Sequence, residues 1–201
     1  MLKDDKPVSP SEIEVPDKSQ PWEVTDSEVV HCNDFFSVRR DQCVSNVTPN
    51  TAAELYVMEL PDTVIVVPVT AGGEFVLIEQ YRHGVAQWVL ECPGGNRESG
   101  EHLETAVLRE LLEETGYRAE SISALNSNPQ DPSCQTGRCF AYLALGCQLE
   151  VSANPDPFEA IQVRKFTREQ LWEAIHRGDD FHLPSLAALL QVLAAPRLVT
   201  G

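Results

Sequence analysis

The amino-acid sequence predicts a mixed α/β domain, and three observations lead to that prediction. Segments rich in β-branched and apolar residues fill much of the chain between residues 35 and 92. The spacing of apolar residues then changes to a helical period between Glu101 and Thr115. Strand-like segments return after this helix, and two helices close the chain. This order indicates a mixed α/β domain and differs from a regular βαβ series.

The first half of the chain contains most of the predicted strands. Each is apolar or β-branched and is bounded by turn residues. The continuous β-branched character of the third indicates a buried strand. A hairpin turn at Ala71–Glu74 follows it, and Pro93-Gly94-Gly95 ends the last. In chain order these strands are Phe35–Val38, Leu55–Met58, Thr63–Val69, Phe75–Gln80 and Trp88–Cys92.

The second half is predicted to contain three helices and further strands. Leu103, Val107 and Leu111 share one stripe of a helix over Glu101–Thr115, and Gly116 is a natural C-terminal stop. Strands are predicted at 121–125 and 140–145, with a polar loop over 127–137 between them. A helix is predicted from a Thr167/Gln170 capping box to His176, and another over 185–194.

Composition and charge exclude several function classes. The chain has 201 residues and a net charge of −16. Phosphate backbones and anionic membranes are bound through Lys and Arg, so we expect no nucleic-acid or membrane partner. No apolar stretch is long enough for a transmembrane helix, and the first residues do not resemble a signal peptide. The six cysteines contain no CxxC pair, which favours reduced thiols in the cytoplasm, with zinc binding as the alternative.

The composition divides the chain into three expected segments. Residues 1–30 are acidic and contain four prolines, which predicts an extended or loosely ordered arm. Residues 31–60 form an N-terminal strand region, and residues 61–201 form the main domain. Trp22 is unusual for such an arm, and we expect it to dock on the chain's own core or on a partner chain.

One cluster of acidic residues carries chemical information. Glu110, Glu113 and Glu114 would project from one side of the predicted helix. Three such carboxylates repel one another, and a hard cation such as Mg²⁺ or Mn²⁺ would relieve the repulsion. A solvated acidic helix surface is the alternative. The preceding glycines favour the cation, because a flexible turn lets backbone carbonyls reach a metal and backbone N–H groups reach a phosphate.

The segment from Gly95 to Tyr117 resembles the Nudix box of the Nudix hydrolases, GX5EX7REUXEEXGU. Every fixed position matches, and Tyr117 stands where a bulky aliphatic residue is usual. The matching residues are Gly95, Glu101, Arg109, Glu110, Leu111, Glu113, Glu114 and Gly116. The resemblance implies an α/β/α sandwich around a mixed sheet, and hydrolysis of a diphosphate by a metal-activated water.

The resemblance also implies roles for single residues. Glu110, Glu113 and Glu114 would bind the metal together with the carbonyl of Gly94. Glu113, Glu114 and Arg109 would act in catalysis, and Glu101 would orient the site. Gly95 would contribute to substrate binding. The implied cofactor is Mg²⁺, with Mn²⁺ possible.

Three further features resemble the ADP-ribose pyrophosphatases of this family. Glu79-Gln80-Tyr81-Arg82 stands in the place of that subfamily's QYR, so Arg82 would bind substrate; a surface arginine is the alternative. Leu90–Gly95 is similar to the ELPAG segment, and Pro132 lies sixteen residues beyond Gly116. The resemblance implies cleavage of ADP-ribose, or a related nucleoside-diphosphate sugar, to a nucleoside monophosphate and a sugar phosphate. It also implies a homodimer formed with the N-terminal strands, and makes Trp22 a candidate for stacking on adenine.

The loop after the box departs from the subfamily pattern. Gln135 stands where a glutamate is often found, and an amide does not accept a proton at neutral pH. Asp131 is the carboxylate in this loop, so it is a candidate base, although a turn-forming role before Pro132 is the alternative. The sequence therefore leaves open hydrolysis of another nucleoside diphosphate derivative, or binding of a nucleotide sugar without cleavage.

Overall fold

The computed structural model describes residues 20–155 and 158–195, and the chain divides into two compact units. Among the described residues, the first unit contains 20–32 and 37–57. The second contains 33–36, 58–155 and 158–195. The whole segment that resembles the Nudix box lies in the second, larger unit.

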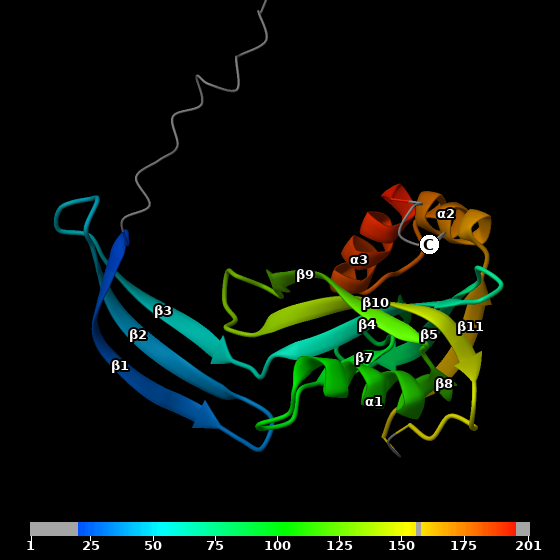
Figure 1. The fold of residues 1–201 in the computed structure, drawn as a ribbon. Helices are drawn as coiled ribbons and strands as arrows, with labels where there is room; N and C mark the ends of the chain where they lie inside the picture. Colours follow the sequence, from blue (N-terminus) through cyan, green and yellow to red (C-terminus); the bar gives the residue numbers. More distant parts are fainter. Residues whose placement is uncertain (1–19, 156–157, 196–201) are drawn as a thin grey trace, which may run out of the picture. The chain divides into compact units, whose positions relative to one another are not determined.

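The first unit is a three-stranded sheet in the order β1-β2-β3 (Figure 1). Its strands are β1 (Trp22–Cys32), β2 (Ser37–Ser45) and β3 (Ala52–Glu59). Of the two alternatives for the expected arm, extended or loosely ordered, Trp22–Val30 take the extended one, because they lie in β1. Residues 1–19 lie outside the described residues. The polar residues of β1 find partners on the antiparallel strand β2, as in the Arg40–Glu28 ion pair at 2.5 Å.

Strand β2 starts two residues later than the sequence predicts. The side chain of Asn33 accepts hydrogen bonds from the backbone N–H groups of Phe35 and Phe36, at 2.8 and 2.9 Å. These bonds close a turn, so Phe35 and Phe36 precede the strand.

The second unit is built on a mixed sheet of eight strands. The central path runs β11-β5-β4-β10-β8, with β6 beside β5, β7 beside β4 and β9 beside β10. The pair β4–β10 is parallel, while the other named pairs are antiparallel. The strands are β4 (Thr63–Thr70), β5 (Phe75–Arg82), β6 (Gln87–Glu91), β7 (Gly94–Asn96), β8 (Tyr117–Arg118), β9 (Ser121–Pro129), β10 (Arg138–Leu149) and β11 (Ile161–Phe166).

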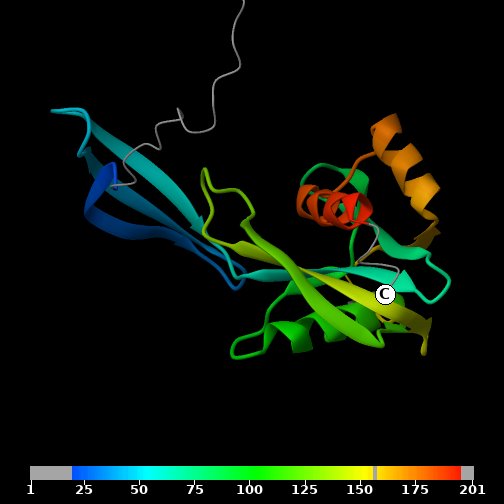
Figure 2. The ribbon, with the colours of Figure 1, turned by 45° about the horizontal axis from the view of Figure 1, so that its top comes forward.

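Three helices cover the two faces of this sheet (Figures 1 and 2). They are α1 (Leu103–Thr115), α2 (Arg168–Arg177) and α3 (Leu183–Ala194). Along β4, Val64 and Val66 pack with α1, while Ile65 and Val67 pack with α3. The alternation explains why β4 is apolar throughout: both of its faces are buried. The expected α/β/α arrangement is confirmed.

The helix ends agree closely with the sequence. Gly116 ends α1 with φ of 76°, and a Cβ there would lie 2.1 Å from the Val151 carbonyl oxygen. The capping box of α2 forms as expected, with Thr167 and Gln170 each bonding the other's backbone N–H. Helix α1 begins at Leu103, so Glu101 precedes it.

No helix among the described residues is long and apolar enough to cross a membrane.

Candidate active site

Helix α1 carries the three motif carboxylates Glu110, Glu113 and Glu114, and they differ in burial. Glu114 is 2% exposed, and the Glu110 side chain is 12% exposed. The Glu113 side chain is 49% exposed. Glu110 and Glu114 therefore form an inner pair on the helix, and Glu113 is an outer carboxylate.

Strand β7 lies against the inner pair, and its glycines leave the space that the carboxylates fill. The Gly94 N–H donates a hydrogen bond to Glu114 Oε2 at 2.8 Å. A Cβ at Gly95 would lie 2.5 Å from Glu110 Oε1, closer than a side chain permits. Helix and strand can approach this closely only because residue 95 has no side chain.

The inner pair resists ionisation. Burial raises the pKa of Glu114 from 4.5 to about 9, although the Gly94 hydrogen bond opposes the shift, and the Glu110 and Glu159 carboxylates raise the pKa further. Burial also raises the pKa of Glu110, against the opposing effect of Arg109. Two such carboxylates, one buried and one partly buried, would be stabilised by added positive charge.

Arg109 connects the carboxylates around α1. Its Nε and Nη2 donate to the two carboxylate oxygens of Glu101, both at 3.1 Å. Its Nη1 donates to Glu110 at 2.8 Å and to Glu113 at 3.2 Å, and Nη2 also reaches the Asn96 carbonyl at 3.2 Å. The guanidinium is thus hydrogen-bonded to three of the carboxylates that surround it.

Comparison with known proteins identifies this arrangement. The family model of the NUDIX domain matches residues 59–189. The chain belongs to the Nudix family. The matched region contains the whole motif on β7 and α1, together with Arg82 on β5.

Two relatives of known function are named as ADP-ribose pyrophosphatases. The ADP-ribose pyrophosphatase of Bacillus subtilis (strain 168) is 30% identical over 139 residues, which are 69% of this chain and 75% of that protein. The ADP-ribose pyrophosphatase of Mycobacterium tuberculosis is 29% identical over 181 residues, 90% of this chain and 86% of that protein. The family match and these relatives assign the chain as a Nudix pyrophosphatase, a hydrolase.

A solved structure confirms the fold. The chain resembles an ADP compounds hydrolase with a TM-score of 0.77 and 21% sequence identity, over 89% of this chain and 95% of the other. At that identity the likeness supports the Nudix fold alone.

Nudix hydrolases generally use divalent metal ions, and the chemistry of the inner pair fits one. Mg²⁺ is commonly held by one or two carboxylates, with waters and substrate phosphates as its other ligands. Over 20–155 and 158–195, no three His, Cys, Asp or Glu side chains converge closely enough to hold a metal ion. Glu110 and Glu114 are the least exposed of the three motif carboxylates, and Glu113 is half-exposed and paired with Arg109.

Arg82, at the end of β5, belongs to the same electrostatic environment. Its Nε and Nη2 donate to the two oxygens of Glu91, both at 2.6 Å, and the Glu91 side chain is 3% exposed. The pKa of Arg82 is raised, chiefly by Glu91, with further contributions from the carboxylates of Glu114 and Glu159. Arg82 therefore contributes a positive charge to the environment of Glu114, and its side chain remains 46% exposed.

Glu159 is a residue of the site that the sequence analysis did not single out. Its charge raises the pKa of Glu110, Glu114 and Arg82, so it belongs to their electrostatic environment. Strand β11 pairs with β5, and the Tyr81 N–H donates to the Ala160 carbonyl at 3.2 Å. Glu159 is next to Ala160 in the chain, so it lies close to the point where β5 ends. Only this pairing of distant segments marks the residue, so no local motif was available to reveal it.

Asp131 lies in a turn after β9, with its hydrogen bonds inside that turn. Its carboxylate accepts hydrogen bonds from the N–H and hydroxyl of Ser133, at 3.1 and 2.5 Å, and from the Cys134 thiol. These bonds, the Ser133 side chain foremost, lower the pKa of Asp131. The Gln135 N–H donates to the Asp131 carbonyl at 2.9 Å.

Trp22 begins β1 in the first unit, where it is half-buried.

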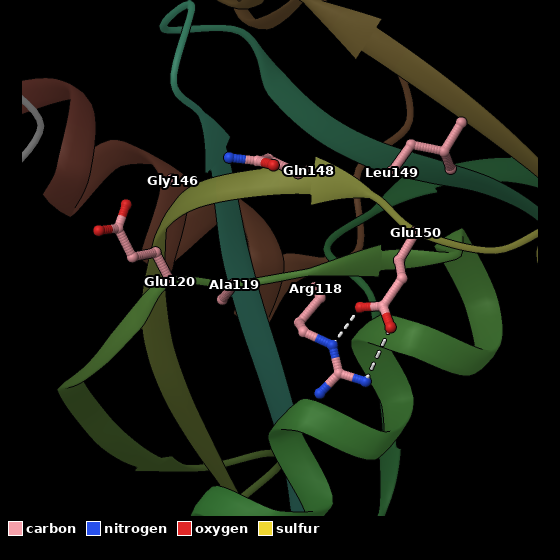
Figure 3. Close-up of a pocket in the computed structure, with 7 residues that line it drawn as sticks. All are labelled: Arg118, Ala119, Glu120, Gly146, Gln148, Leu149 and Glu150. Carbon is pink, nitrogen blue, oxygen red and sulfur yellow. Dashed lines mark hydrogen bonds and ion pairs between the residues drawn. The ribbon is translucent and has the colours of Figure 1, made fainter.

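The second unit also has an open depression of about 290 Å³ at β8 and β10 (Figure 3). Arg118 and Glu150 form an ion pair there, and the side chain of Glu120 lies beside Gly146. Its lining contains neither the inner pair nor Arg82. This depression is therefore separate from the candidate active site, which is defined by the motif carboxylates.

The raised pKa of Glu114 makes stability depend on pH when metal is absent. The folded chain retains a proton that the unfolded chain loses above its ordinary pKa of 4.5. We therefore expect the free energy of unfolding to fall as pH rises from about 4.5 towards 9, because the folded state then binds more protons than the unfolded state.

Urea unfolding in a chelator over that pH range measures this dependence. Glu114→Gln should flatten the profile, while Glu113→Gln, at the half-exposed position on the same helix, should leave it in place. A profile that Glu114→Gln does not change would contradict the assignment of the buried charge to Glu114.

Proposed function

We propose that this protein hydrolyses the pyrophosphate of ADP-ribose, or of a related nucleoside-diphosphate sugar, to a nucleoside monophosphate and a sugar phosphate. One observation carries the proposal: the motif carboxylates Glu110 and Glu114 are largely removed from water, and a partly exposed arginine, Arg82, acts electrostatically on Glu114. A diphosphate suits both groups: a cation held by the carboxylates would bind its phosphates, and Arg82 would bind a phosphate directly. The names of the relatives support ADP-ribose as the first substrate to test.

We propose Mg²⁺ as the cofactor, with Mn²⁺ as the second candidate. Glu110 and Glu114 would hold it, with Glu113 and the Gly94 carbonyl as further ligands. When bound, a divalent cation neutralises diphosphate charge and makes a water molecule more acidic. Arg109 and Glu101 would keep the carboxylates oriented through the bonds described above.

The phosphate contacts would come from β5 and β7. Glu91 occupies Nε and Nη2 of Arg82, which leaves Nη1 for a phosphate oxygen of the substrate. The Gly95 backbone lies beside Glu110, so it is a candidate for contacting the same diphosphate. The bound substrate would therefore contact both Arg82 on β5 and the Gly95 backbone on β7.

We propose Glu159 as the residue that takes or relays the proton of the attacking water. Its charge reaches the inner pair, whereas the carboxylate of Asp131 is engaged within its own turn. A proton acceptor must lie within hydrogen-bond reach of the reacting water, which favours the residue whose charge acts on Glu110 and Glu114. Asp131 is the alternative.

The second candidate function is binding of a nucleotide sugar without cleavage. Gln135 in the loop after the box favours it, because an amide is no base. The complete set of box carboxylates favours hydrolysis, since binding alone does not need them. Analysis of products by chromatography separates the two.

We also propose that the protein is a homodimer formed through the first unit. The three-stranded sheet exposes several large apolar side chains, which are Val24, Val29, Val30 and Tyr56. A second copy would cover such a surface. In that assembly Trp22, at the start of β1, would be a candidate for stacking on the adenine of the substrate.

The proposed compartment is the cytoplasm. Cys43, Cys92, Cys134, Cys139 and Cys147 carry free thiols. Thiols in this number suit a reducing environment.

A substrate panel tests the reaction. With Mg²⁺ we expect ADP-ribose or another nucleoside-diphosphate sugar to be cleaved, and Glu114→Gln to lower kcat by roughly two orders of magnitude or more, because the cation loses a charged ligand. Glu104→Gln, at an exposed position on the same helix, is the matched control. Tight calorimetric binding of the whole panel with no product would favour the binding module.

The proton acceptor is tested by two conservative variants. Glu159→Gln should lower kcat by roughly 10²-fold or more while KM changes little, and Asp131→Asn should leave kcat nearly unchanged. The reverse result would transfer the role to Asp131. Stability of both variants is checked by thermal unfolding.

The oligomeric state is tested by light scattering coupled to gel filtration. We expect the mass of two chains, and we expect Val29→Glu to shift the protein towards one chain, because a charge in an apolar interface is costly. A monomeric wild type would remove the dimer from the proposal.

A further inference from the structure

The segment between α2 and α3 lies along β6 as an additional strand would. The Leu90 N–H donates to the Asp180 carbonyl at 2.8 Å, and the His182 N–H donates to the Leu90 carbonyl at 3.0 Å. Leu90 also forms a parallel bridge with Phe181, and both pack in the same core. These contacts fix His182 at the N-terminus of α3, next to Glu91.

His182 lies behind the carboxylate that holds Arg82. Its Nδ1 is 3.6 Å from Glu91 Oε2, the same oxygen that accepts from Arg82 Nη2 at 2.6 Å. Glu91 therefore lies between Arg82 and the His182 ring. Because the Glu91 side chain is only 3% exposed, the ring limits where that carboxylate can turn.

The orientation of the ring is itself fixed. His182 Nδ1 lies 3.0 Å from the hydroxyl of Ser185, which is fully buried. Ser185 Oγ accepts a hydrogen bond from the Cys92 N–H at 3.0 Å. Burial lowers the pKa of His182, while Glu91 opposes this effect and Arg82 adds to it. His182 Nδ1 and the Ser185 hydroxyl are hydrogen-bond partners, so the chain of contacts runs from the end of β6 through Ser185 to His182.

We propose that His182 is a positioning residue for substrate binding. It closes the space behind Glu91, and so keeps the Arg82 guanidinium at the angle that presents Nη1 to a substrate phosphate. The inference rests on the proposed function, in which Arg82 binds the diphosphate. A bidentate pair transmits orientation because its two parallel bonds leave the guanidinium little rotational freedom.

The experiment is a double-mutant cycle with ADP-ribose in the full chain. His182→Ala should raise KM roughly fivefold with kcat within about twofold, a size typical of coupling within one network of contacts. His182→Asn, which keeps a polar group at the δ position for Ser185, should recover most of the loss. In the Arg82→Ala background, His182→Ala should have no further effect on KM.

A matched control and a second readout keep the result interpretable. His176 is exposed on α2, where Nδ1 lies 2.7 Å from the Trp172 carbonyl oxygen, so His176→Ala should leave KM unchanged. Thermal unfolding reports whether His182→Ala folds, and His182→Asn provides the test if it does not. Calorimetric Kd values for ADP-ribose without metal repeat the cycle independently of turnover.

The outcomes separate the two claims. If the wild type neither cleaves nor binds ADP-ribose, the proposed ADP-ribose function and this inference fail together. If the wild type is active but the effects of His182→Ala and Arg82→Ala add, or KM is unchanged in His182→Ala, the inference about His182 is overturned and the proposed function stands. Loss of the His182 effect in the Arg82→Ala background supports it.

Discussion

The close contact between helix α1 and the backbone of β7 is the constraint on which the rest of the site depends. Glu114 accepts the Gly94 N–H, and Glu110 fills the place where a Cβ of residue 95 would be. This contact takes two carboxylates out of water, which raises the pKa of both. The cost of burying them is a reason for the site to attract positive charge.

The positive groups around the inner pair are arranged from two directions. Arg109 comes from α1 itself and engages Glu101 and Glu110. Arg82 comes from β5 and is held by Glu91, a buried residue of the neighbouring strand β6. The acidic balance of the whole chain, −16, therefore has a local meaning here: the acids near the site are paired with two arginines and still leave carboxylates for a cation.

The fold around this contact was largely predictable because its signals are local. The continuous β-branched run of β4, the stop at Gly116 and the capping box at Thr167 act over a few residues. Where the prediction was open or differed, pairing decided the outcome. Trp22–Val30 have the composition of an extended or loosely ordered arm and pair with β2, and the Asn33 side chain closes a turn that delays that strand to Ser37.

The site divides in the same way. The box residues from Gly95 to Gly116 were identified by their order, because a glycine turn followed by one helix side is a local arrangement. The motif does not distinguish Glu113 from Glu110 and Glu114, since burial depends on what β7 covers. Asp131 was a candidate because it is the carboxylate of the loop after the box, and in the structure that carboxylate is hydrogen-bonded within its own turn.

The sequence by itself determined the family, the helix that carries the carboxylates and the glycines that accompany them, since these features depend on neighbours in the chain. Only the tertiary structure decided which carboxylates are buried, that the charge of Glu159 acts on them, and that His182 lies next to Glu91. Those placements come from β7 on α1, β11 on β5 and the α2–α3 segment on β6. Each is a pairing between segments far apart in the chain, and spacing along one segment does not encode it.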